Sequence, residues 1–257
     1  MKTVIATIGL LAALAAGAHA AVKIEPVEYS IDGVKLKGQI AYDDAVKDKR
    51  PGVIVVHQWW GLNEFARRRA RMLAESGYVA LAVDMFGEGK TTEHPDEAGK
   101  WASEVRAKQQ TGIDRFMAGY NVLKQNPHVD ASHISAIGYC FGGSVVLDVA
   151  LAGIDLDAAI SVHGGLPTDP VATKPKARIL VCNGAADPMV TQEQIASFQK
   201  VATDAGADWE FISYAGAKHA FSDPDADKHG IPALAYNEKA DRRSWATILD
   251  FLAESGK

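Results

Sequence analysis

The stretch GYCFGG at residues 138–143 decides the fold of this chain. It follows an apolar run at 134–137 and precedes a helical pattern at 144–152. A strand, a sharp turn with a nucleophile between small residues and a helix together are the pattern of a nucleophile elbow, here with Cys140 in place of serine. Gly138 and Gly142 leave room at the turn, because a side chain there would strike the neighbouring strand or helix. The alternative is a glycine-rich turn that surrounds a buried cysteine by chance.

Around this stretch, apolar runs of strand length alternate with helical patterns. Asp32-Gly33 predicts a tight turn between two N-terminal antiparallel strands. The expected strands lie at 22–30, 34–42, 52–56, 78–83, 134–137, 157–162, 178–183 and 209–214, and the expected helices at 64–76, 95–110, 112–125, 144–152, 191–205 and 233–254. Strands that alternate with helices after a hairpin predict an α/β fold of the α/β-hydrolase kind. Its central sheet is mostly parallel, with helices on both faces, and forms a single domain over residues 21–257.

Residues 1–20 have the pattern of a secretory signal peptide. Lys2 supplies the positive start, residues 4–16 the apolar stretch, and Ala18-His19-Ala20 the cleavage site. A membrane helix is the alternative, but the apolar stretch is shorter than the ~20 residues that span a bilayer. The sequence therefore predicts a product that is periplasmic or secreted and holds no membrane segment after cleavage.

Charge and cysteine content narrow the function classes. The formal net charge of −5 argues against nucleic acid or anionic lipid as a partner. Cys140 and Cys182 are the two cysteines. In an exported protein they could form a disulfide, but a domain of this size does not need one. We expect two free thiols, with Cys182 as a small buried hydrophobe in a strand. The sequence sets no oligomeric state.

Three chemically matched residues follow predicted strands. The carboxyl ends of parallel strands gather at one edge of a sheet. Cys140, Asp187 and His219 follow such ends, in the nucleophile–acid–base order of α/β-hydrolases. His219 would take the thiol proton and return it to the leaving group, while Asp187 would hold the other imidazole nitrogen. The alternatives are a chain turn at Asp187-Pro188 and a hydrogen-bonded loop histidine at 219.

An attacked carbonyl becomes an oxyanion, which needs N–H donors already in place. The backbone N–H of Phe141, directly after the nucleophile, is the first expected donor. The second is expected in the turn after strand 52–56, at the N–H of Trp59. His57 in the same turn is expected to shape this loop rather than to transfer protons.

Further residues near the strand ends are candidates for the substrate pocket. Trp60 and Phe86 would wall an apolar pocket, together with Trp59, or would belong to the core. His163 would be a pocket wall or structural residue, with a rival catalytic base as the alternative. Gln58, Glu88 and Asp223 complete the predicted pocket.

No metal or other cofactor is predicted. The segment at 223–227 resembles the start of a calcium loop, but it lacks glycine at the sixth position and has Leu234 at the twelfth. A solvated acidic loop is the preferred interpretation. The histidines form no H-x-x-x-H pair and the cysteines do not cluster.

The chain resembles the dienelactone hydrolase family from about Val34 to its C-terminus. The resemblance rests on the motifs at 53–63, 138–143, 184–187 and 217–221, and on Asp84 after its strand. It implies an α/β-hydrolase fold, hydrolysis of a small ester or lactone through a thiol acyl-enzyme, and no cofactor. It also implies that the triad is Cys140, Asp187 and His219.

At three positions the chain departs from the family. The resemblance implies a glutamate where this chain has Gln58, and substrate-binding arginines where it has Glu88 and Asp223. Two carboxylates would repel an anionic dienelactone, so we expect a small neutral substrate. The alternatives are a non-catalytic protein that binds a ligand or senses oxidants through Cys140, and a different hydrolase such as a peptidase or thioesterase.

Overall fold

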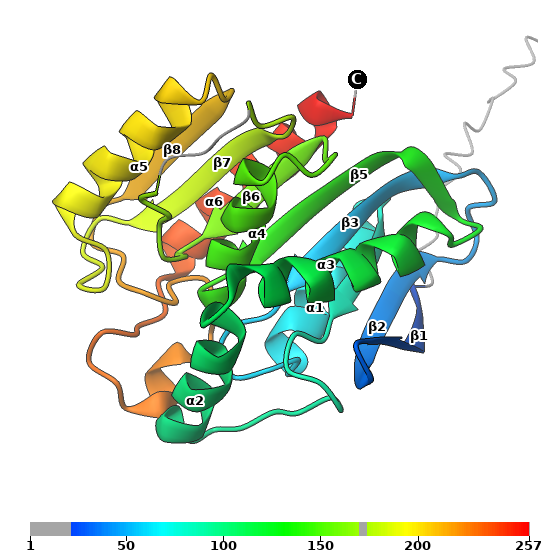
Figure 1. Cartoon of the computed structure of the whole chain (residues 1–257), viewed down its shortest axis with the longest axis horizontal. Helices are drawn as coiled ribbons and strands as arrows, with labels where there is room; N and C mark the ends of the chain where they lie inside the picture. Colours follow the sequence, from blue (N-terminus) through cyan, green and yellow to red (C-terminus); the bar gives the residue numbers. More distant parts are fainter. Residues whose placement is uncertain (1–21, 170–173, 257) are drawn as a thin grey trace, which may run out of the picture.

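A computed structural model describes residues 22–169 and 174–256, and its centre is a sheet with the strand order β1-β2-β4-β3-β5-β6-β7-β8 (Figure 1). β1 and β2 are antiparallel to their neighbours, and the strands from β4 onward are parallel. The strands are β1 Val22–Ile31, β2 Val34–Asp43, β3 Arg50–Val56, β4 Val79–Val83, β5 Val129–Tyr139, β6 Ala158–Val162, β7 Arg178–Gly184 and β8 Trp209–Tyr214. The predicted mostly parallel sheet with an N-terminal hairpin is confirmed.

The hairpin turn forms where the sequence predicts it. Asp32 and Gly33 both have positive φ, at 49° and 77°, as a two-residue primed turn requires. β1 pairs with β2 along its whole length, and β2 attaches the hairpin to β4.

Helices cover both faces of the sheet (Figure 1). Side chains alternate along each strand, so Val53 and Val55 pack with residues of α1 and α6. Ile54 and Val56 point to the other face and pack with residues of α2, α3 and α4. The helices are α1 Glu64–Glu75, α2 Pro95–Arg106, α3 Gln109–Lys124, α4 Phe141–Leu151, α5 Gln192–Asp204, the short 3-10 helix η1 Ala226–His229 and α6 Glu238–Ser255.

Helix starts differ most from the prediction. α6 was expected from residue 233 but begins at Glu238, because the Asn237 side chain accepts a hydrogen bond from the Ala240 N–H and Leu234 is held in a bridge to His219. Thr191 caps α5 with a full capping box. Asn63 occupies the start of α1, but its side chain makes no capping bond.

The predicted signal peptide at 1–20 lies outside the described residues. Within the part of the chain that the structure describes, no helix is long and apolar enough to cross a membrane.

Candidate active site

Cys140 stands on a strained turn between β5 and α4. Its φ of 53° and ψ of −114° lie in a region that residues with side chains rarely adopt. Glycines make the turn possible, since a Cβ on Gly138 would lie 2.0 Å from the Gly142 oxygen and one on Gly142 would lie 2.4 Å from the Val56 oxygen. The sequence prediction of a nucleophile elbow is therefore met by the backbone.

The sheet register brings the three predicted triad residues to one edge. Gly138 pairs with Val56, Val162 with Cys182 and Gly184 with Tyr214, so the carboxyl ends of β3, β5, β6, β7 and β8 are level. Loops that begin there carry Asp187 and His219 toward the elbow. The sequence order of these residues thus becomes a spatial cluster.

Asp187 and His219 form a buried hydrogen-bonded pair. Asp187 Oδ2 lies 2.8 Å from His219 Nδ1, and the two residues are 7% and 4% exposed. The other Asp187 oxygen, Oδ1, accepts the Met189 N–H at 2.8 Å, which fixes the carboxylate. His219 Nε2 is buried without a hydrogen-bond partner among the described residues, and it is the ring nitrogen left to serve Cys140.

Charge coupling between Cys140 and His219 favours a thiolate–imidazolium pair. Burial alone would raise the pKa of the Cys140 thiol, but the charge of His219, followed by the charge of Arg106 and the Phe141 N–H, lowers it. Burial alone would lower the pKa of His219, but Cys140 and Asp187 raise it to about 10. A lowered pKa of this kind increases the fraction of a thiol that is thiolate at neutral pH.

The two expected oxyanion donors lie in the turns that follow β5 and β3. The Phe141 N–H at the start of α4 points to the Cys140 sulfur. Trp59 lies in the turn after β3, and in the described part of the chain its N–H donates no backbone hydrogen bond. His57 holds that turn as a neutral ring, since its Nδ1 lies 2.5 Å from the Gln58 oxygen and its Nε2 accepts the Met85 N–H at 3.1 Å.

Gln58 and Asp223 pair with each other instead of facing open solvent. Gln58 Nε2 donates to Asp223 Oδ2 at 2.6 Å, and the two residues are 1% and 3% exposed. The other Asp223 oxygen accepts the Asp225 N–H at 2.9 Å. The Asp223 carboxylate is therefore engaged in joining the turn after β3 to the loop that carries His219.

Glu88 does not join the site, which corrects the sequence prediction. It forms an exposed ion pair with Lys37 at 3.1 Å, and its N–H donates to the Lys35 oxygen on β2. β2 lies three strands from β5 in the sheet, or roughly 14 Å at about 4.8 Å per strand. Glu88 therefore no longer supports the prediction of a neutral substrate, while the Asp223 carboxylate stays buried beside Gln58.

Trp60 and Phe86 belong to the core, not to a pocket wall. Trp60 is 1% exposed and stacks on His229 at 3.9 Å between ring centroids. Phe86 packs between His57 and Phe141, at 4.8 and 5.2 Å. Of the two interpretations open for these aromatic residues, the structure supports the core.

His163 is buried behind His219, with 5.3 Å between the two ring centroids. Its Nε2 bonds to Ser222 Oγ at 2.9 Å. Burial, and then the charge of His219, lower the pKa of His163 well below its ordinary value. His163 therefore stays a neutral neighbour of His219, and it is His219 that bonds to Asp187.

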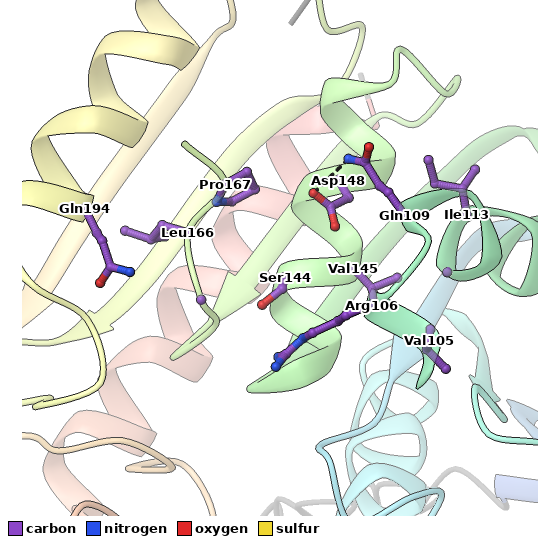
Figure 2. A pocket seen from close by; sticks show the side chains of 12 residues that line it. Val105, Arg106, Gln109, Ile113, Ser144, Val145, Asp148, Leu166, Pro167 and Gln194 are labelled. Atoms are coloured by element: carbon purple, nitrogen blue, oxygen red, sulfur yellow. Dashed lines mark hydrogen bonds between the residues drawn. The ribbon is translucent and has the colours of Figure 1, made fainter. Parts of the chain in front are cut away.

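Sequence reasoning missed a cavity beside the elbow, which Figure 2 shows. Arg106 at the end of α2 and Ser144 on the first turn of α4 line it, with Gln194 of α5 opposite. No motif marks Arg106, because it is one of several charged residues on an exposed helix. Sequence reasoning also missed the buried Arg69, which bonds to Asp241 and to the Ser222 oxygen. The signal that could have found it is a cation on the apolar face of α1.

Over the described residues, no group of three or more His, Cys, Asp or Glu side chains is placed to hold a metal ion.

Several known proteins resemble this chain in sequence or in structure. The profile of the dienelactone hydrolase family matches residues 36–256. Protein usf of Aquifex pyrophilus is 32% identical over 202 residues, which cover 76% of this chain and 85% of that protein. A putative carboxymethylenebutenolidase of Aquifex aeolicus is 28% identical over 232 residues, 88% of this chain and 96% of that protein.

One solved structure agrees closely with the whole arrangement. It is a dienelactone hydrolase-like promiscuous phosphotriesterase from metagenomic libraries, similar with a TM-score of 0.89 and 33% identity over 92% of this chain and 99% of that one. The chain therefore belongs to the dienelactone hydrolase family and is a hydrolase of the carboxylic ester and lactone class.

Proposed function

We propose that this protein hydrolyses a small ester or lactone through a thiol acyl-enzyme formed on Cys140. The observation that carries the proposal is the buried 2.8 Å bond between Asp187 and His219, whose charge opposes the effect of burial and lowers the pKa of the Cys140 thiol. A protein that only binds a ligand needs no buried carboxylate–imidazole pair behind its cysteine. The name of the Aquifex aeolicus relative, a putative carboxymethylenebutenolidase, supports a lactone as one form of the substrate.

The reaction has two halves. The Cys140 thiolate attacks the carbonyl carbon, and the oxyanion that forms accepts hydrogen bonds from the Phe141 and Trp59 N–H groups. The carbon–oxygen bond to the leaving group then breaks, and His219 gives that oxygen its proton. Water, deprotonated by His219, attacks the thioester. The carbon–sulfur bond breaks, the acid is released and the thiolate–imidazolium pair of the enzyme is restored. Asp187 stabilises the imidazolium during both halves.

A panel of chromogenic esters and lactones tests the proposal. Wild type should turn over at least one compound, and Cys140→Ala and His219→Ala should each lower kcat by about a thousandfold or more. Cys182→Ala and His133→Ala are matched controls, because Cys182 lies inside β7 and His133 bonds to Asp157 on the surface. Mass spectrometry should find the acyl group on Cys140. Activity that survives in both site variants would reject the mechanism.

A redox-sensing thiol is a second candidate, favoured by the lowered pKa of Cys140. Oxidation of Cys140 by micromolar peroxide, together with no turnover of any ester or lactone, would favour it.

We also propose export, on the pattern of residues 1–20. Expression of the whole chain with fractionation should yield a mature protein that begins at Ala21 outside the cytoplasm, and an uncut cytoplasmic product would contradict this.

A further inference from the structure

We propose that Arg106 selects substrates whose acyl group carries a negative charge, and that the cavity beside the elbow receives this group. The inference rests on the proposed thiol hydrolysis and names the class of substrate that the same site takes. Neither of the positions where the family resemblance implies arginines takes part, since Glu88 is remote and Asp223 is paired with Gln58.

The cavity has a volume of about 310 Å³, and its lining begins at Ser144, one helical turn after Cys140. Ser144 and Val145, on the first turn of α4, form one wall, and Gly165 and Leu166 after β6 form another. Figure 2 shows Arg106 and Ser144 at the end of the cavity near the start of α4. A substrate attached to Cys140 can therefore extend into it.

Arg106 is a cation without a protein partner at this end. Within the described residues its guanidinium makes no hydrogen bond or ion pair, and it lies over the Phe141 ring, 5.3 Å from the ring centroid. Phe141 directly follows Cys140, so this contact holds the positive charge next to the reacting carbon. An arginine in this setting retains all of its N–H donors for a planar anion such as a carboxylate.

Asp148 brings a carboxylate into the same cavity, within range of the Arg106 charge. Asp148 lies one helical turn beyond Ser144 on α4 and accepts the Gln109 amide at 3.1 Å. The end next to Cys140 is positive, because Arg106, the His219 imidazolium and the N-terminus of α4 all lie there. A short acyl group with a terminal carboxylate fits this polarity, and a long one would approach Asp148.

A pair of thiol reagents tests the inference without any turnover. Iodoacetate and iodoacetamide are nearly equal in size, and both react with the same Cys140 thiolate, so the ratio of their rate constants reports charge selection alone. Arg106→Gln should lower the iodoacetate-to-iodoacetamide ratio about fivefold, and Arg106→Lys should restore most of it. Arg242→Gln, an exposed arginine on α6 without polar contacts among the described residues, should leave the ratio unchanged.

Salt provides an internal check. About 1 M KCl should reduce the wild-type ratio toward that of Arg106→Gln and leave the variant nearly unaffected, because an exposed charge is screened. An unchanged ratio in Arg106→Gln would overturn the inference. So would equal slowing of both reagents, which would mean that Arg106 acts only on the thiol.

Turnover extends the test to esters. 4-Nitrophenyl hemiglutarate should lose about fivefold in kcat/KM on Arg106→Gln, and 4-nitrophenyl valerate should change little. If wild type turns over neither ester but the reagent ratio still falls in the variant, the proposed function fails and anion selection by Arg106 stands. Equal losses on the two esters would reject the selection.

Discussion

Cys140 lies between two regions that treat polar side chains in opposite ways. On the paired side, Gln58, Asp223, Asp187 and His219 are buried, and each of these side chains has a hydrogen-bond partner in the protein. On the open side, the cavity lined by Arg106, Ser144, Gln109 and Gln194 is open to solvent. The paired side fixes where the reacting atoms lie, because moving one buried partner leaves another unsatisfied. The open side retains donors for a ligand.

Glycine substitutions should give the largest contrast between the sides. A Cβ on Gly142 would lie 2.4 Å from the Val56 carbonyl oxygen, which is backbone and cannot move aside. Gly142→Ala should therefore cost about 3 kcal/mol or more in unfolding free energy. On the open side, a Cβ on Gly165 meets only the Ser144 hydroxyl at 3.1 Å, so Gly165→Ala should cost less than about 1 kcal/mol. Urea unfolding measures both, and equal losses would refute the distinction.

A second carboxylate on the paired side should have the next largest effect. Gln58→Glu would place the new carboxyl against Asp223, where the amide now donates at 2.6 Å. The pKa of the new carboxyl would rise above its ordinary ~4.3, so the folded state would bind a proton that the unfolded chain releases. The variant should match wild type near pH 4 and lose stability as pH rises, by roughly 2 kcal/mol at pH 7.

The open side supplies the matched control for that experiment. Gln109→Glu also faces a carboxylate, Asp148, but at an exposed position. Solvent should keep its cost below about 0.5 kcal/mol at pH 7. A pH dependence equal to that of Gln58→Glu would show that the two sides are equally solvated.

The pH profile of Cys140 alkylation should show that the paired side dominates the thiol's charge. His219 opposes burial and lowers the pKa of Cys140, so wild type should retain thiolate below the usual ~8.5, and the rate should fall only as pH drops through this lowered value. His219→Ala removes that effect and leaves burial, so the midpoint should move up by a unit or more. Arg106→Gln should move it less. A midpoint that stays the same in His219→Ala would contradict the ion pair.

The smallest effect is expected from Gln109→Ala, which removes the exposed bond to Asp148. The loss should stay below about 0.5 kcal/mol, a shift of 1–2 °C in Tm. A larger loss would mean that the open side also has a structural role.

Local pattern predicted the parts of the fold that local chemistry controls. The elbow followed from glycines around Cys140, and the hairpin from Asp32-Gly33. The grouping of Cys140 with Asp187 and His219 needed only the alternation of strands and helices, because parallel strands bring their ends together.

Long-range partners explain what the sequence could not show. The loop after β4 carries Glu88 away because Asp84 collects the N–H groups of Phe86, Gly87 and Gly89 and binds that of Lys37 on β2. Trp60 became a core residue because η1, far along the chain, places His229 against it. No periodicity in the sequence encodes either contact.

The buried thiol of Cys182 can report how often the centre of the sheet opens. It lies inside β7 with no exposed surface, its sulfur 3.7 Å from the Tyr214 hydroxyl, and burial raises the pKa of the thiol to about 12. Among the described residues, the native molecule therefore presents one titratable sulfur and the denatured chain presents two. The appearance of the second sulfur in a colorimetric assay would time how often the centre of the sheet opens.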